Sequence, residues 1–172
     1  MNCHITATGS FLPGPRIDNE NLPAFMGELD GEAELRTKIL RMNGIKYRHY
    51  ALNRDQTATH DLYELGTQAA QTCLKGRTGE IDYLSAGSTN TPLVGPGFAS
   101  ILHDRLNEAG YLRENLEINS NTGICTSSAQ ALVNACRAVS CGDHSRALCV
   151  GAEQPSDILK SSVIEPPDDR DQ

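Results

Sequence analysis

The sequence lacks any apolar run approaching the roughly 20 residues that a helix needs to cross a bilayer, so a membrane-spanning protein is not expected. Its opening residues, MNCHITATGSFLP, have neither the charged n-region nor the apolar h-region of a secretion signal. The chain also has no internal repeat and no low-complexity tract. We therefore expect a cytoplasmic protein without a membrane anchor.

Basic residues are in the minority, with 15 Lys and Arg against 22 Asp and Glu and a net charge of −7. This balance argues against nucleic acid as the main partner and against a polybasic membrane attachment. The acidic residues are spread along the chain, apart from the stretch EPPDDRDQ at 165–172, which we interpret as a solvated acidic tail.

The chain has no C-x-x-C pair, although it has six cysteines: Cys3, Cys73, Cys125, Cys136, Cys141 and Cys149. Most fall inside apolar periodic segments and not in loops, so they do not resemble a disulfide framework, and we expect reduced thiols. A zinc-binding site is one interpretation of the three cysteines that lie near His144 in the sequence: Cys136, Cys141 and Cys149. We expect no metal, because Cys136 and Cys149 have the spacing of the inner faces of a helix and a strand.

The 172 residues suit one domain, or part of a larger one. The apolar spacing predicts strands and helices that alternate, which is typical of an α/β layer fold with a largely parallel sheet. No domain boundary is evident inside the chain. The predicted strands are 3–13, 45–52, 81–89, 116–120 and 145–153, and the predicted helices are 31–42, 57–73, 98–109 and 126–140.

The segment INSNTGICTSSAQALVNAC, residues 118–136, places Cys125 where a strand gives way to a helix. A sulfur at the first turn would face unpaired backbone N–H groups and the positive end of the helix dipole, which favour a nucleophilic thiolate. Only Arg137 carries charge within 126–140, so we expect this helix to be buried on most sides. Spacing alone leaves open a packing cysteine followed by three capping residues, Thr126, Ser127 and Ser128.

Several motifs follow one another in the order found in the β-ketoacyl-acyl-carrier-protein synthase III group. They are ITATGSFLPGPRIDNENL, RMNGIKYRHYA, EIDYLSAGSTNTPLVGPGFAS, INSNTGICTSSAQAL and RALCVGAE. Over about residues 4–160 the chain resembles the N-terminal half of these condensing enzymes, which have the thiolase fold. The resemblance implies one α/β half of a five-layer αβαβα architecture with a mixed, mostly parallel sheet. Residues 1–172 would then be the N-terminal half-domain that carries the nucleophile.

The same resemblance implies an acyltransferase in which Cys125 accepts an acyl group from a thioester, with its own backbone N–H as an oxyanion-hole donor. Decarboxylative Claisen condensation with a malonyl or β-ketoacyl thioester would follow, in fatty-acid or in polyketide or resorcinol-type metabolism. No cofactor is implied, since acyl-CoA or acyl-ACP is the substrate. The family's histidine and asparagine lie in its C-terminal half, so no residue of this chain takes either role.

The implied partners are a C-terminal half, possibly as a separate chain, a second copy in a homodimer, and acyl carrier protein or coenzyme A thioesters. Arg41, Lys46 and Arg48 fall where the family takes the coenzyme A or phosphopantetheine arm, although a solvated charged surface explains them too. Leu93 and Val94 are candidates for setting acyl length, or ordinary loop residues.

The sequence is also compatible with other functions. Some relatives keep the cysteine but transfer acyl groups to oxygen or nitrogen without forming a carbon–carbon bond. A non-catalytic half-domain that binds a carrier protein and a thioester hydrolase are further alternatives. Among the histidines, we expect His144, in a loop beside Asp143, to be solvated.

Overall fold

The computed structural model describes residues 2–28, 33–77 and 79–164. The chain divides into two compact units, which we describe separately. The first, which we call the sheet unit, combines Met1–Phe11 with Leu62–Glu153, and the second combines Leu12–Asp61 with Gln154–Gln172. The predicted acidic tail at 165–172 lies outside the described residues.

The sheet unit is built on three parallel strands in the order β4-β3-β5. The central strand β3 (Tyr83–Gly87) is buried along its whole length, as expected for a parallel strand covered on both faces. It pairs in register with β4 (Glu117–Asn121) and β5 (Ala147–Gly151). All three strands therefore end together at one edge, which we call the carboxyl edge, and begin together at the opposite amino edge.

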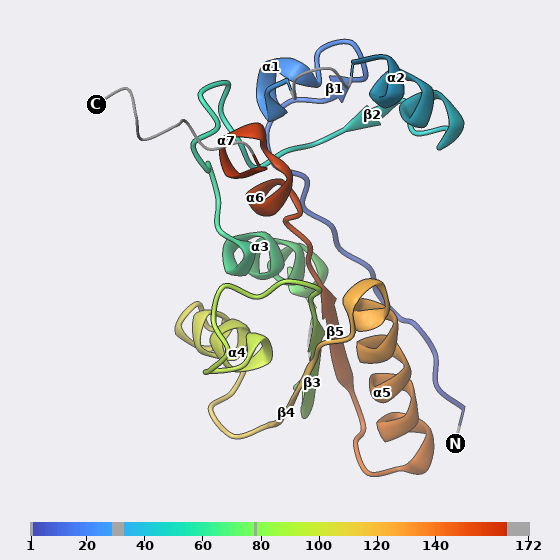
Figure 1. Ribbon diagram of the computed structural model, residues 1–172. Coiled ribbons are helices and arrows are strands. Elements are labelled where there is room, and N and C mark those ends of the chain that lie inside the picture. Colours follow the sequence, from blue (N-terminus) through green and yellow to red (C-terminus); the bar gives the residue numbers. More distant parts are fainter. Residues whose placement is uncertain (1, 29–32, 78, 165–172) are drawn as a thin grey trace. The chain divides into compact units, whose positions relative to one another are not determined.

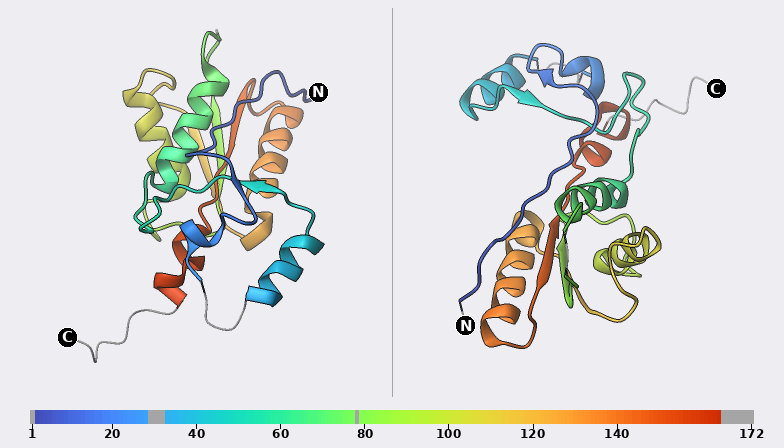
Figure 2. Two further views of the ribbon diagram at one scale, coloured as in Figure 1. Left: turned by 90° about the horizontal axis from the view of Figure 1, so that it is seen from above. Right: turned by 180° about the vertical axis from the view of Figure 1, so that it is seen from behind.

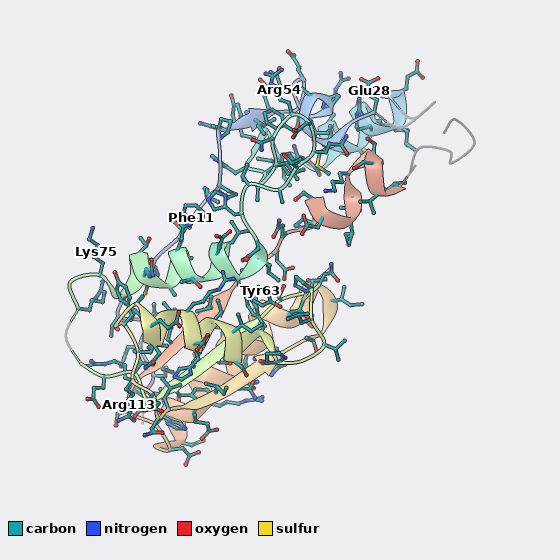
Figure 3. The ribbon with its side chains drawn as sticks, turned by 90° about the vertical axis from the view of Figure 1, so that its left-hand side faces the viewer. Phe11, Glu28, Arg54, Tyr63, Lys75 and Arg113 are labelled. Atoms are coloured by element: carbon teal, nitrogen blue, oxygen red, sulfur yellow. The ribbon has the colours of Figure 1, made fainter. Side chains whose placement is uncertain are left out.

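Helices cover both faces of this sheet, giving the sheet unit three layers (Figures 1 and 2). α3 (Leu62–Leu74) and α4 (Phe98–Glu108) pack on one face, and α5 (Ser127–Cys141) packs on the other. The tyrosine at the start of α3, Tyr63, is directed toward α4 (Figure 3), and its ring centroid lies 5.8 Å from that of Phe98. The side chains that α4 buries recur at helical spacing: Phe98, Leu102 and Leu106.

The second unit has little regular structure. Two short strands, β1 (Ile17–Asp18) and β2 (Tyr47–Arg48), pair antiparallel. The helices of this unit are α1 (Pro23–Met26), α2 (Ala33–Met42), α6 (Ser156–Leu159) and α7 (Ser161–Ile164). The predicted extended piece at 45–52 is thus reduced to the two residues of β2.

The opening strand predicted at 3–13 is wrong, because the described residues of this segment form no strand. The segment instead lies close against α3. A Cβ atom at Gly9 would stand only 2.3 Å from the backbone N of Cys73, and the Arg77 guanidinium donates to the Thr6 carbonyl oxygen at 3.4 Å. Contact with a helix has therefore replaced pairing in the sheet.

The other predicted boundaries shift by a few residues. The helix predicted from 57 begins at Leu62, because the preceding residues form a turn in which the Asp55 carboxylate accepts the backbone N–H of Thr57 at 3.0 Å. α5 ends at Cys141, one residue beyond its predicted end, and Gly142 takes the left-handed conformation, with φ 86°, that closes helices. Within the described ranges, every helix is too short or too polar to cross a membrane.

Candidate functional site

Cys125 lies at the carboxyl edge of the sheet, in a short 3₁₀ turn, η1 (Ile124–Thr126), that leads directly into α5. Its thiol is exposed. The cysteine therefore precedes the first residue of the α-helix instead of forming part of its first turn, and the 3₁₀ turn lies between β4 and the helix.

Side-chain hydroxyls hold this turn together. The Ser127 hydroxyl accepts the backbone N–H of Gly123 at 2.9 Å and donates to the Ile124 carbonyl oxygen at 2.7 Å. The Thr126 hydroxyl donates to the Gly123 carbonyl oxygen, also at 2.7 Å. Two of the three residues offered as helix caps, Thr126 and Ser127, thus bond to the turn, and neither caps α5 through its side chain. They fix the backbone on both sides of Cys125.

A second set of bonds reaches the turn from the ends of β3 and β5. The Thr89 hydroxyl lies 2.8 Å from the Ile124 carbonyl oxygen and 3.0 Å from one oxygen of the Glu153 carboxylate. The backbone N–H of Thr89 also donates to that carboxylate, at 3.0 and 3.1 Å to its two oxygens. Neither Thr89 nor Glu153 was predicted from the sequence as a site residue. Their one signal is that each is polar and stands two residues beyond the last residue of a strand.

Glycines allow the start of α5 to approach the sheet closely. A Cβ atom at Gly87, the last residue of β3, would lie 2.3 Å from the backbone oxygen of Ser127. At Gly151, the last residue of β5, it would meet the Ser128 side chain at 2.6 Å. A larger residue at either position would push the cysteine turn away from the sheet.

A chain of amides runs from the sheet to α5 below the turn. Buried Asn121, the last residue of β4, donates to the Ser85 hydroxyl and to the Ala86 carbonyl oxygen, each at 3.1 Å. Its own amide oxygen accepts from Asn134 of α5 at 2.7 Å, and Asn134 accepts from Gln130 at 2.9 Å. These bonds satisfy the side-chain amide of Asn121 and fix the register of α5 on the sheet.

The prediction that this helix is buried on most sides is wrong for the described chain. Only Ser127, Ala131 and Ala135 of α5 are buried, whereas Leu132 and Val133 remain 42% and 41% exposed. The sheet covers one face of the helix, and within the described ranges the opposite, charge-poor face is open. The low charge of the sequence thus indicates a face suited to burial that the described residues do not cover.

The other sequence candidates take no part in these bonds. Leu93 and Val94 belong to the loop between β3 and α4, where both side chains are exposed. Arg41 and Lys46 are exposed in the second unit, and Arg41 lines a shallow depression along α2. Arg48 is half-buried and donates to Asn19 at 2.5 Å, so its guanidinium already has a structural partner.

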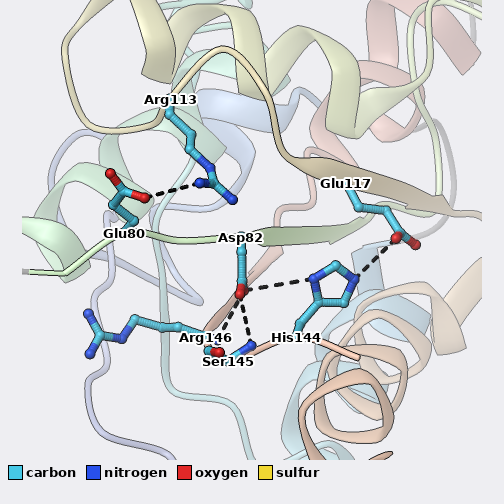
Figure 4. A network of polar contacts seen from close by, with 7 residues as sticks. All are labelled: Glu80, Asp82, Arg113, Glu117, His144, Ser145 and Arg146. Carbon is cyan, nitrogen blue, oxygen red and sulfur yellow. Dashed lines mark hydrogen bonds and ion pairs between the residues drawn. The ribbon is translucent and has the colours of Figure 1, made fainter. Parts of the chain in front are cut away.

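The amino edge of the sheet carries a different network, built from charged groups (Figure 4). The Asp82 carboxylate accepts the backbone N–H groups of Ser145 and Arg146 at 2.8 and 3.0 Å. The His144 ring lies 3.1 Å from Glu117, stacks on Tyr83 and is only 15% exposed. The expectation of a solvated His144 is therefore wrong.

These contacts also set the acidity of Asp82. Burial alone would raise its pKa, but the two N–H donors and the nearby His144 outweigh this effect, so the pKa falls below its ordinary value. A surface pair lies at the same edge, where Arg113 is 3.0 Å from Glu80. The amino edge therefore favours the ionised form of Asp82.

Two thiols of the sheet unit, Cys149 and Cys136, have pKa values above the ordinary one. Burial raises the pKa of Cys149, in β5, to about 11, with a further contribution from the nearby Cys136. Burial and contact with Cys3 raise the pKa of Cys136. Among the described residues, no group of three His, Cys, Asp or Glu side chains is arranged to hold a metal ion.

No model of a known protein family matches the chain. A β-ketoacyl-[acyl-carrier-protein] synthase III of Xanthomonas oryzae pv. oryzae (strain MAFF 311018) is 31% identical over 155 residues, which are 90% of this chain and 44% of that protein. The chain resembles the N-terminal half of synthase III. The synthase III of Neisseria meningitidis serogroup C (strain 053442) is 27% identical over 158 residues, 90% of this chain and 45% of that protein.

Solved structures show the same fold. A synthase III from Pseudomonas aeruginosa PAO1 aligns with a TM-score of 0.66 at 22% identity, over 90% of this chain and 44% of that one. AbyA1, a tetronic acid condensing enzyme, aligns with a TM-score of 0.69 at 24% identity, over 94% and 47%. The α/β fold is therefore thiolase-like, and the chain spans about half the length of the proteins it matches.

Proposed function

We propose that this chain is the nucleophile-bearing half of a thioester-dependent acyltransferase of the condensing type. The observation that carries the proposal is an exposed cysteine in a tightly bonded turn at the start of α5, in a chain 31% identical to a synthase III over 155 residues. A buried packing cysteine, the alternative that the sequence left open, would not be exposed in this way.

In the proposed first step, the Cys125 thiolate attacks the carbonyl carbon of an acyl thioester. A bond forms between sulfur and carbon, the bond to coenzyme A or to the carrier arm breaks, and that arm leaves as a thiolate. The backbone N–H of Cys125 donates to the negative charge that develops on the carbonyl oxygen. The product is an acyl-Cys125 intermediate.

In the second step, a malonyl or β-ketoacyl thioester supplies the carbon nucleophile. Loss of carbon dioxide from a malonyl group leaves a carbanion, which attacks the acyl carbonyl carbon and releases the Cys125 thiolate. The groups that would activate this donor belong to the other half of the enzyme. Fatty-acid and polyketide or resorcinol-type synthesis are the proposed settings, with no cofactor beyond the thioester substrates.

The second α/β half, on the same or a separate chain, is the proposed occupant of the open face of α5. That face exposes Leu132 and Val133 and carries little charge, and the relatives are more than twice as long as their matched part. A homodimer is proposed as the complete assembly. The outer edge of β4, whose only neighbour among the described strands is β3, offers a surface for the second copy.

For the substrates, Arg41 and Lys46 are the better candidates for the phosphates of coenzyme A or a carrier arm, because both are exposed. Arg48 is a weaker one, since it already binds Asn19. Leu93 and Val94 are proposed to contact the acyl group, and their exposure in the described chain leaves them accessible.

Mass spectrometry tests the nucleophile directly. The complete enzyme incubated with acetyl-CoA should gain one acetyl mass, and Cys125→Ala should gain none. Cys141→Ala is the matched control, because it removes the exposed thiol at the other end of α5. An adduct that persists in Cys125→Ala would sink the assignment.

The choice of reaction requires a second measurement. Release of carbon dioxide from a malonyl thioester, dependent on acylated Cys125, is expected for condensation. Acyl transfer to an alcohol or amine without this release would favour the alternative reaction, and free acid as the only product would favour a hydrolase. Carrier-protein binding without any adduct would indicate a non-catalytic half-domain.

A further inference from the structure

The residue before Cys125 has a strained backbone. Ile124 has φ 51°, in the left-handed region that glycine and asparagine tolerate but β-branched residues rarely adopt. The neighbouring Gly123, which could take this conformation freely, has an extended φ of −177° instead. Such a conformation persists only where surrounding contacts enforce it, and it often marks a functional site.

The enforcing contacts converge on one atom. The carbonyl oxygen of Ile124 accepts from the Ser127 hydroxyl at 2.7 Å, within the turn, and lies 2.8 Å from the Thr89 hydroxyl, beyond the end of β3. Two hydroxyls from different parts of the chain therefore hold the peptide group between Ile124 and Cys125. The contact from Thr89 is the one that ties the turn to the sheet.

Thr89 is in turn fixed by Glu153, beyond the end of β5. The carboxylate accepts the Thr89 backbone N–H with both oxygens, and one of these oxygens also lies 3.0 Å from the Thr89 hydroxyl. A hydroxyl has one proton for its two acceptors, Glu153 and the Ile124 carbonyl. Glu153 therefore fixes the position of the Thr89 backbone and competes with the Ile124 carbonyl oxygen for the Thr89 hydroxyl proton.

The orientation of Cys125 follows from this arrangement. A trans peptide is planar, so its C=O and N–H groups point in opposite directions. Holding the Ile124 carbonyl toward Thr89 and Ser127 directs the Cys125 N–H the other way. We propose that Thr89 and Glu153 are positioning residues that aim the Cys125 N–H and thiol at the substrate. This inference rests on the proposed function of Cys125.

The test uses paired substitutions on the complete enzyme. Thr89→Val removes the hydroxyl at nearly constant shape, whereas Thr89→Ser keeps it. Glu153→Ala removes both interactions with Thr89. Glu153→Gln keeps an acceptor for the Thr89 N–H and adds a donor for its hydroxyl. Two rates are measured in each variant: acetylation by acetyl-CoA, and alkylation by iodoacetamide of Cys125 and, as an internal control, of Cys141.

We expect Thr89→Val and Glu153→Ala to slow acetylation at least about tenfold, because small displacements of a reacting group have effects of this size. Alkylation of Cys125 should change in both variants while that of Cys141 does not. The Ser and Gln variants should stay within about twofold of wild type. Such rescue would not be expected if the two side chains only added general stability.

Two results would overturn the inference. One is acetylation at the wild-type rate in Thr89→Val and Glu153→Ala; the other is equal slowing in the conservative variants. Each is distinct from failure of the proposed function, in which Cys125→Ala still forms the adduct. Should Thr89→Val not fold, as judged by its melting curve, the comparison between Glu153→Ala and Glu153→Gln decides the question.

Discussion

The two edges of the three-stranded sheet are held together by different sets of side chains. At the carboxyl edge, hydroxyls and closely packed glycines hold an exposed thiol in a strained turn. At the amino edge, Asp82 and Glu117 surround His144, and their contacts join the loop before β5 to β3 and β4. The groups that bond to the Ile124 carbonyl oxygen are neutral hydroxyls, and the Glu153 carboxylate acts on the cysteine turn through Thr89. The charged network lies where no reaction is proposed.

The largest effect is expected from Gly87→Ala at the carboxyl edge. The new methyl group would meet the Ser127 backbone, which cannot move without displacing α5, so we expect a loss of about 2–3 kcal/mol in the free energy of unfolding. Gly151→Ala should lose only about 1 kcal/mol, because the atoms it meets belong to the Ser128 side chain. Denaturant titration of both variants measures the difference, and equal losses would contradict the close-packing argument.

The next prediction concerns where thiols react. Cys149 lies inside the sheet with a pKa of about 11, so near pH 7 almost none of it is thiolate. We expect iodoacetamide to modify Cys125 at least about 100-fold faster than Cys149. Peptide mapping after timed alkylation measures the ratio. Comparable rates would mean that reactivity is not confined to the carboxyl edge.

At the amino edge, Asp82→Ala should lower the free energy of unfolding by about 1–3 kcal/mol, because two backbone N–H groups lose their acceptor. The pKa of Asp82 is lower in the folded protein, so its stabilising effect is fully present above the ordinary value of about 3.9 and is lost as the pH falls through the folded value. Denaturation curves at pH 7 and below pH 3 should therefore show a smaller difference between variant and wild type at the lower pH.

The same variant sharpens the comparison between edges. Asp82→Ala should leave the alkylation rate of Cys125 unchanged, since the two sites lie at opposite ends of the strands. A substantial change in that rate would show that the amino and carboxyl edges are coupled and not independent.

The smallest effect is expected for Arg113→Ala. The pair with Glu80 is 3.0 Å long, but its side chains are 46% and 76% exposed, and exposed pairs contribute about 0.5 kcal/mol or less. Thermal melting of Arg113→Ala and Glu80→Ala should give nearly wild-type curves. A large shift would indicate that the surface pair belongs to the Asp82 network.

The sequence was a good guide where short-range periodicity determines structure. Phe98, Leu102 and Leu106 have helical spacing and are buried as one face of α4. The position of Cys125 just before a helix could also be predicted, because small helix-forming residues follow it. The sheet order could not, since pairing depends on contacts between residues far apart in the chain.

The misses have the same physical origin. The neighbours of His144 in sequence predict a solvated side chain, yet its partner Glu117 lies 27 residues away. Intrinsic preference would place the left-handed residue of the turn at Gly123. Ile124 adopts this conformation instead, and its carbonyl oxygen contacts Ser127 and also Thr89, which is 35 residues away. Thr89 and Glu153 could not be recognised from the sequence, because it is the pairing of β3 with β5 that brings them together.

The unusual backbone of Ile124 has a consequence for how substitutions combine. Asparagine adopts the left-handed backbone conformation readily. Because Ile124 is 69% exposed, Ile124→Asn would remove little buried apolar surface. In Ile124→Asn, residue 124 would favour the left-handed conformation without the contact from the Thr89 hydroxyl. We expect Thr89→Val to slow acetylation in the wild-type sequence but to have little effect on that rate when combined with Ile124→Asn. The two positions would therefore show strong epistasis.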